Sequence, residues 1–286
     1  MRRLLSATAS IATAALGLTM CLSTPSQAAP ITFTWDPAAT GDSTAGQFTA
    51  NNFNYSDFAT IQFPTNTTTP GSIIENGFLI FTSFFNGTST VPTGVNTRQT
   101  ATHPGFGLYE QFTTTSSGTG NTTNFTGAFD SASVTFYIYS TQHGLAHVSF
   151  TGPNHTPIIV LPSGANPLEL ATETGPISGS PNVADINQGV PTASIDTLFT
   201  PNLGEAGFFV SPNPSMPLDL EHAFTNTTTV VSTIPSPCKP TATCFIEIKG
   251  GGGNGTFFGT VVPEPTTLAL FGAGLSFLGL VRRRRS

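Results

Sequence analysis

The sequence predicts an all-β protein, arranged as an antiparallel β-sandwich or jelly roll, from two observations. Short runs of alternating apolar and polar residues recur along the chain, separated by Gly, Pro, Asn, Ser and Thr, which favour turns. Patterns with the helical period are scarce between the two ends of the chain. Many short strands joined by turns are typical of packed antiparallel sheets.

The clearest strand is predicted over residues 134–139, where Val134, Phe136 and Ile138 share one face. The polar and tyrosine side chains between them share the other face, so the strand is expected to be half-buried. Similar runs predict further strands over residues 31–35, 59–63, 78–85, 107–113, 146–150, 193–199, 207–210, 218–226, 245–249 and 256–261.

Two segments interrupt this pattern. Prolines are dense between residues 152 and 189, which predicts edge strands and loops within a single β domain. The glycine-rich run 250–255 is followed by neither a helix nor a Lys-Ser or Lys-Thr pair, so it does not fit a phosphate-binding loop. It is predicted to form a flexible hairpin tip.

The body of the chain, residues 30–262, is acidic but poor in charge. It contains fourteen carboxylates, from Asp36 to Glu247, and only three basic residues, Arg98, Lys239 and Lys249. This balance excludes nucleic-acid binding, which depends on clustered Lys and Arg. Charged residues make up 8% of the chain and phenylalanine occurs 24 times, a composition that favours an exported β protein over a disordered chain.

Residues 1–29 have the pattern of a signal peptide in helical form. Arg2 and Arg3 precede an apolar stretch, and signal peptidase is expected to cut after Ala28 or Ala29. Cys21 offers a lipidation alternative, although the large residue before it does not suit that modification. The chain is therefore predicted to be exported.

The last residues combine a proline-flanked glutamate, an apolar run and an arginine cluster. They are Pro263, Glu264 and Pro265, then residues 266–281, then Arg282, Arg283, Arg284 and Arg285. A helix of about 16 residues is roughly 24 Å long, which spans a hydrocarbon core of about 30 Å only marginally. The arginines are expected to stay on the cytoplasmic side, which places the body on the outer side.

This three-part order resembles the sorting signal of PEP-CTERM proteins, a segment that is sometimes labelled as an ice-binding protein C-terminus. The resemblance implies that residues 263–286 are recognised and cut by an exosortase-type membrane protease, with residues 266–281 held transiently in the inner membrane. It also implies a bacterium that makes extracellular polysaccharide, and release to the cell surface or matrix. An ordinary tail anchor is the alternative.

The body is similar, over five short motifs, to flocculation-associated PEP-CTERM proteins: residues 33–37, 48–57, 75–78, 107–109 and 208–210. This resemblance implies a non-enzymatic surface protein that acts in adhesion, flocculation or exopolysaccharide association. The rival hypothesis is a secreted glycan-active hydrolase or a lectin-like module. In that case exposed rings would stack on sugars, and the aromatic candidates are Trp35, Tyr55, Tyr109, Tyr137 and Tyr139.

The mature body retains two cysteines, Cys238 and Cys244, and an exported pair at this spacing is predicted to form a disulfide. No catalytic residue, cofactor or metal site is predicted. His143, His147 and His155 are close in sequence, but Gly144 and strand-like neighbours favour a turn over a zinc-binding helix. Calcium binding by the acidic body stays open, without assigned ligands.

Overall fold

The computed structural model of the chain describes residues 30–258, except residues 42, 64–70, 122–123, 174–177, 184–191, 202–206, 212–217, 226–229, 235–238 and 240–242. Residues 30–259 form one compact unit. The predicted signal peptide, with Ala28 and Ala29, and the predicted sorting segment lie outside the described residues.

The described residues form strands and a single short 3-10 helix, η1 (Pro37–Thr40). The strand pairs are antiparallel, which confirms the all-β, antiparallel prediction. In chain order the strands are β1 (Phe33–Trp35), β2 (Phe48–Ala50), β3 (Asn52–Phe63), β4 (Gly71–Asn86), β5 (Ser89–Val91), β6 (Gly107–Asn121), β7 (Asn124–Tyr139), β8 (His147–Thr151), β9 (Thr156–Val160), β10 (Leu168–Glu173), β11 (Ser178–Val183), β12 (Thr192–Pro201), β13 (Phe209–Ser211), β14 (Leu218–Thr225), β15 (Val230–Ile234) and β16 (Cys244–Phe258).

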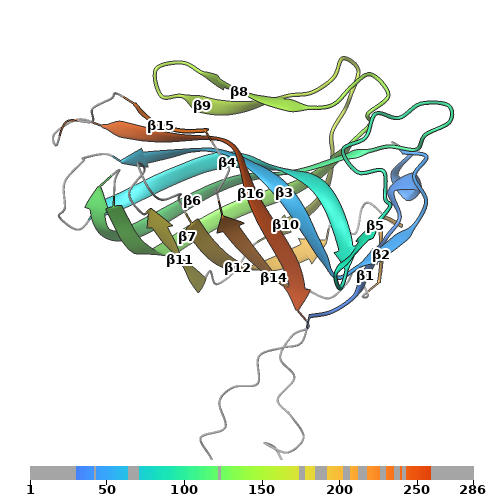
Figure 1. The fold of residues 1–286 in the computed structure, drawn as a ribbon, viewed down its shortest axis with the longest axis horizontal. Coiled ribbons are helices and arrows are strands. Elements are labelled where there is room, and N and C mark those ends of the chain that lie inside the picture. The colour runs from blue at the N-terminus through green and yellow to red at the C-terminus, as the bar shows by residue number, and fades with distance from the viewer. Residues whose placement is uncertain are drawn as a thin grey trace, which may run out of the picture. The chain divides into compact units, whose positions relative to one another are not determined.

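The main sheet closes on itself, and its strands are called the ring below (Figure 1). Starting at β7, neighbouring strands run β6, β4, β3, β16, β14, β12 and β11, and β11 pairs again with β7. The predicted sandwich or jelly roll is therefore corrected to one sheet that encloses its own core. Strands as long as β4 and β7 twist strongly, so a sheet built from them curls, and closure leaves few free edges.

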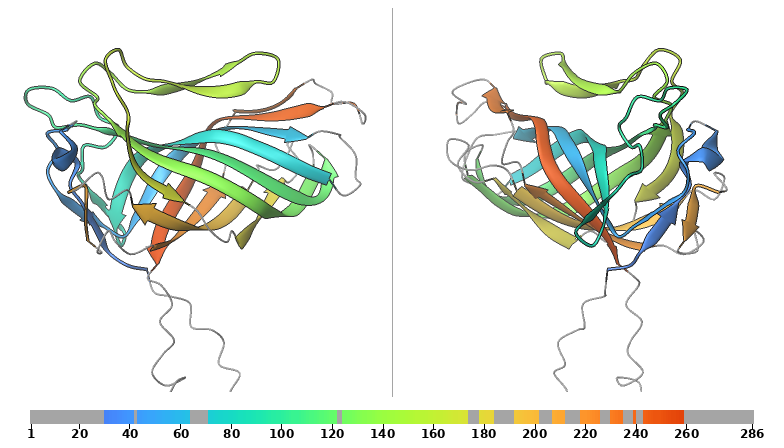
Figure 2. Two further views of the ribbon diagram at one scale, coloured as in Figure 1. Left: turned by 180° about the vertical axis from the view of Figure 1, so that it is seen from behind. Right: turned by 45° about the vertical axis from the view of Figure 1, so that its right-hand side comes forward.

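Two smaller sheets accompany the ring. Strands β13, β1 and β2 form one of them, and β8 and β9 form the other, which is a hairpin. The hairpin lies outside the ring in both views of Figure 2, and β9 packs against β3 and β4. The ring therefore closes without the strands of either smaller sheet.

Aromatic side chains fill the inside of the ring, called the inner core below. Trp35 of β1 contacts seven phenylalanine rings at centroid distances of 4.5 to 6.0 Å: Phe33, Phe48, Phe84, Phe136, Phe208, Phe209 and Phe257. Because these rings come from several strands of both sheets, Trp35 ties the small β13–β1–β2 sheet to the ring.

The predicted faces of residues 134–139 are confirmed. Val134, Phe136 and Ile138 belong to the inner core, whereas Tyr137 and Tyr139 pack in a second cluster on the outer face. The alternation within β7 therefore separates two apolar clusters rather than a core from solvent.

The glycine-rich run lies in the middle of β16 and is not a hairpin tip, contrary to the prediction. Gly253 pairs with Tyr55 of β3, and Gly255 pairs with Phe53. A Cβ atom at Gly253 would lie 2.2 Å from the Tyr55 ring, and one at Gly255 would lie 2.3 Å from the Phe53 ring. The run is glycine-rich because rings of the neighbouring strand occupy the space that side chains would need.

The two ends of the described unit lie side by side. Pro30 forms a β-bridge with Phe258, and the Ile31 N–H donates a 2.9 Å hydrogen bond to the Phe257 carbonyl. The described unit therefore begins and ends at one corner of the fold. Among the described residues, there is no helix with the length and hydropathy that a bilayer span requires.

Candidate functional site

The residues predicted to direct sorting cannot be placed, because positions 263–265 and 282–285 lie outside the described residues. Cys244 begins β16 and is fully buried, but Cys238 also lies outside the described part of the chain. The Cys238–Cys244 disulfide stays a prediction. The described residues do contain a polar cluster around a buried carboxylate, which sequence reasoning missed.

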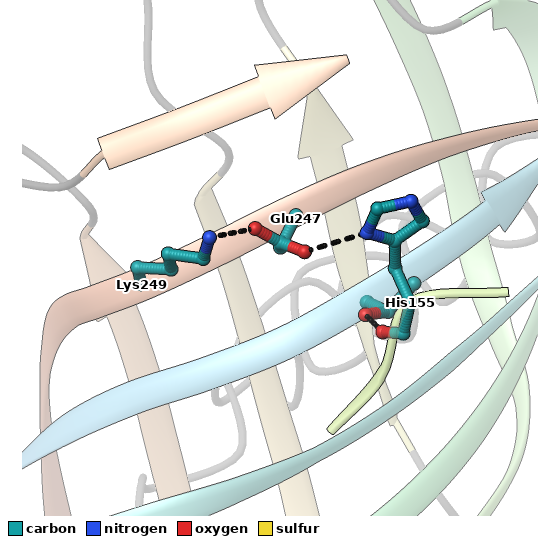
Figure 3. Close-up of polar contacts among 4 residues, drawn as sticks. His155, Glu247 and Lys249 are labelled. Atoms are coloured by element: carbon teal, nitrogen blue, oxygen red, sulfur yellow. Dashed lines mark hydrogen bonds and ion pairs between the residues drawn. The ribbon is translucent and has the colours of Figure 1, made fainter. Parts of the chain in front are cut away.

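This cluster lies at the tip of the β8–β9 hairpin and is called the hairpin clasp: Thr60, His155, Glu247 and Lys249 (Figure 3). The Glu247 side chain is only 3% exposed. Its Oε2 lies 3.0 Å from His155 Nδ1, and its Oε1 pairs with Lys249 Nζ. The Thr60 hydroxyl donates to the backbone carbonyl of His155, so the ring holds the hairpin through both a side chain and the main chain.

The local folds of β16 and the hairpin explain this geometry. Glu247 and Lys249 are two residues apart on β16, so both point outward, while Ile246 and Ile248 point into the inner core. His155 ends the turn between β8 and β9, at a φ of 50° that non-glycine residues adopt rarely. Lys249 Nζ also lies 5.2 Å from the centroid of the Phe150 ring in β8.

The clasp fits a structural role better than a catalytic one. A buried carboxylate needs partners, and Glu247 has one cationic partner and one histidine partner. His147 lies at the opposite end of the hairpin from His155, because it pairs with Val160 while the turn follows Thr151. Among the described residues, no three His, Cys, Asp or Glu side chains are grouped to hold a metal ion.

The hairpin covers an apolar group on the outer face of the ring, called the outer cluster: Phe78, Ile80, Tyr109 and Tyr139, with Val148 and Ile159 of the hairpin packed against them. The Ala146 N–H donates a 3.0 Å hydrogen bond to the Tyr139 hydroxyl. Burial raises the pKa of both the Tyr109 and the Tyr139 hydroxyl, so both stay protonated.

The rings proposed as sugar-stacking faces do not form an exposed platform. Trp35 and Tyr55 are buried in the inner core, and Tyr109 and Tyr139 are buried in the outer cluster. Tyr137 is half-buried and stacks on Tyr109 at a centroid distance of 5.0 Å. These residues are therefore packing residues, and the lectin-like interpretation loses the observation that suggested it.

Among the side chains that the structure describes, three carboxylates lie on the inner face of the ring, a feature that sequence reasoning also missed. Asp57 and Glu110 are buried, and Leu79 lies between them, paired with both across β4. Burial raises the pKa of Glu75 to about 7, against the opposing effect of its hydrogen bond with Thr114. The signal that could have found them is a carboxylate at an inward position of a strand, as in Leu108-Tyr109-Glu110.

Comparison with protein families supplies the functional information that the described geometry lacks. The model of the PEP-CTERM protein-sorting motif matches residues 261–285. The chain carries a PEP-CTERM sorting motif. The match includes every residue predicted for sorting, and it implies export and membrane-associated processing by an exosortase. Searches among curated proteins and among solved structures find no match.

The PEP-CTERM motif follows closely after the body. β16 ends at Phe258, and only residues 259 and 260 separate it from the start of the match. Because Phe258 also pairs with Pro30, the predicted signal-peptide cleavage site precedes the same corner of the fold. Removal of either end therefore cuts the chain outside the ring.

Proposed function

We propose that this protein is a non-enzymatic protein of the cell surface or extracellular matrix, which acts in adhesion, flocculation or exopolysaccharide association after exosortase processing. The observation that carries this proposal is the PEP-CTERM motif at residues 261–285. Extracellular polysaccharide is the proposed partner of the body, and signal peptidase and exosortase are the proposed processing enzymes.

The polar, weakly charged surface of the body supports this proposal. It has few charges, and the outer face of β6 and β7 carries hydroxyl pairs such as Thr115 with Ser131 and hydroxyl–carboxylate pairs such as Ser117 with Asp130. Such a surface suits hydrated polysaccharide. The hydrolase or lectin-like alternative receives less support, because the rings that would stack on sugars are buried.

The decisive experiment replaces Glu264 by alanine in the native host and compares intact mass, location and cell aggregation with the wild type. We expect the wild type to lose the residues from Pro263 onward and to reach the surface or matrix, while Glu264→Ala stays full length in the membrane and aggregation falls. Glu169→Ala, at an exposed position in β10, is the matched control and should be processed normally.

Two outcomes would contradict the proposal. A full-length, membrane-held wild type with an unaffected Glu264→Ala variant would reduce the tail to an anchor. Normal processing with no difference in aggregation or polysaccharide retention between the wild type and a deletion strain would remove the adhesive role.

A further inference from the structure

The loop that joins β5 to β6, residues 92–106, carries an exposed cation. From Asn76 to Tyr109 the sequence contains no Asp, Glu or Lys, and Arg98 is the only arginine in this segment. Arg98 is exposed, and its guanidinium makes no ion pair or hydrogen bond with any residue that the structure describes. Lys249, by contrast, is paired with Glu247. Arg98 is therefore a positive charge that the described fold does not use.

The base of this loop belongs to the core. Val95 and Phe106 form a β-bridge, and both are buried in the inner core. The Asn96 N–H donates a 2.8 Å hydrogen bond to the Phe106 carbonyl, and the Ser43 hydroxyl donates to the Gly105 carbonyl at 3.2 Å. The loop is therefore fixed to the body on both of its sides.

The contact between Gln99 and Thr141 determines which side chains of the loop face solvent. The Gln99 N–H donates a 3.1 Å hydrogen bond to the Thr141 hydroxyl, which donates a 2.7 Å hydrogen bond to the Thr97 carbonyl. Thr141 is fully buried, and Gln99 is only 8% exposed. Because Gln99 is directed inward, its neighbours Arg98 and Thr100 are turned to solvent, where both are exposed.

A tight turn next to Arg98 adds exposed hydrogen-bonding groups. The Thr100 N–H donates a 2.9 Å hydrogen bond to the His103 carbonyl, and the His103 N–H donates to the Thr100 hydroxyl at 3.1 Å. The Thr102 hydroxyl lies 3.0 Å from His103 Nδ1. All three residues are exposed. Because the turn is closed by its own hydrogen bonds, it loses little conformational entropy when it binds a partner.

The chemistry of these groups fits an acidic sugar. A guanidinium binds a carboxylate through two parallel hydrogen bonds, and threonine hydroxyls and an imidazole can bond to sugar hydroxyls. A uronic acid carries a carboxylate and hydroxyls on one ring. The rest of the body would repel an acidic polymer, because the body has fourteen carboxylates and three basic residues. Contact with such a polymer is therefore confined to places such as this loop.

We propose that Arg98, Thr100, Thr102 and His103 form a binding site, called the uronate site, for an acidic polysaccharide that contains uronic acids. Arg98 pairs with the sugar carboxylate, and the other three residues bond to sugar hydroxyls. The inference rests on the proposed function, because it names the class of polysaccharide that the body holds. One exposed ion pair contributes little, so a single site binds weakly, and many copies on one polymer bind through avidity.

The first test measures retention of the purified, host-processed protein on a dense layer of immobilised polygalacturonate. We expect the wild type to be retained, and Arg98→Gln to weaken its retention by at least about threefold. Lys239→Gln is the matched control, because it removes one positive charge at another exposed position, and it should be retained like the wild type. Circular dichroism checks that the variants are folded.

The second test separates recognition of the sugar from attraction to its charge. Thr102→Val keeps the shape of the side chain but removes the hydroxyl, so retention on polygalacturonate should fall. Thr90→Val, at an exposed position in β5, is the matched control and should not change retention. A layer of dextran, which has no carboxylates, should retain the wild type and Arg98→Gln equally.

Three outcomes overturn the inference: a wild type that polygalacturonate does not retain, an Arg98→Gln variant retained like Lys239→Gln, or a Thr102→Val variant retained like Thr90→Val. Arg98-dependent retention on single-stranded DNA or phosphatidylglycerol vesicles, without retention on polygalacturonate, would also overturn it and assign the loop to phosphate.

The binding assay and the aggregation assay can fail separately, because all of these variants keep Glu264. Failed binding to polygalacturonate, together with weaker aggregation in the deletion strain, refutes the uronate site alone. Arg98-dependent binding, without any aggregation difference between the wild type and the deletion strain, refutes the proposed function alone.

Discussion

The two halves of β16 fill the inside of the ring in opposite ways. In the first half, between β15 and β3, Ile246 and Ile248 point inward and fill the core themselves. In the second half, between β14 and β3, glycines leave the space to Phe53 and Tyr55 of the neighbouring strand. The comparison teaches that a strand can contribute to a core by the room it leaves, and that a glycine run does not by itself indicate a turn.

The largest loss of stability is expected when an inward side chain is removed from the first half of β16. Ile246→Ala removes a fully buried side chain from the inner core, and we expect a loss of about 2–5 kcal/mol in the free energy of unfolding, measured in urea. Ile158→Ala, at an exposed site, should change that free energy by no more than about 0.5 kcal/mol. A similar loss for both variants would contradict the packing described for this half.

A smaller loss of stability is expected when a side chain is added at a glycine in the second half of β16. Gly253→Ala forces a Cβ atom against the Tyr55 ring, and overpacking of this kind costs about 1–3 kcal/mol. Gly46→Ala is the control, because no atom lies within 4 Å of its added Cβ. The double variant Gly253→Ala with Tyr55→Leu should be less destabilised than the sum of the two single changes, and simple additivity would show that the ring and the glycine do not share this space.

The smallest loss of stability is expected when an outward-pointing side chain in the first half of β16 is changed. Glu247→Gln keeps the shape of the side chain but removes the charge that faces His155 and Lys249, and we expect a loss of about 1 kcal/mol. Hydrogen exchange should rise in residues 147–160 and stay unchanged in β3 and β4. Glu169→Gln, at an exposed site, is the control, and equal exchange in both variants would mean that the clasp does not hold the hairpin.

Local alternation predicted the strands that carry strong apolar patterns, such as residues 134–139 and 218–226. For the long strands, the predicted ranges were too short. A strand was predicted over residues 107–113, whereas β6 continues to Asn121 through Thr, Ser and Gly. Those residues pair well in a ladder but give no apolar signal, so their strand character depends on the neighbouring strands. The closure of the sheet depends on pairings such as β12 with β14, which local pattern cannot reveal.

The same difference separates the sorting motif from the hairpin clasp. The sorting motif is contiguous, so the sequence alone predicted it, and the family match confirms the motif. The hairpin clasp joins His155 to Glu247, 92 residues away, and to Thr60, 95 residues away. No short-range pattern links these residues, because their meeting depends on the fold of the whole body.

The place of β16 in the ring has a mechanical consequence. It is the last strand before the sorting motif, and it is hydrogen-bonded to β3, β14 and β15. A pull on the chain at Phe258 therefore acts first on the β14 and β3 ladders, which reach Phe258 and Thr256 of this strand.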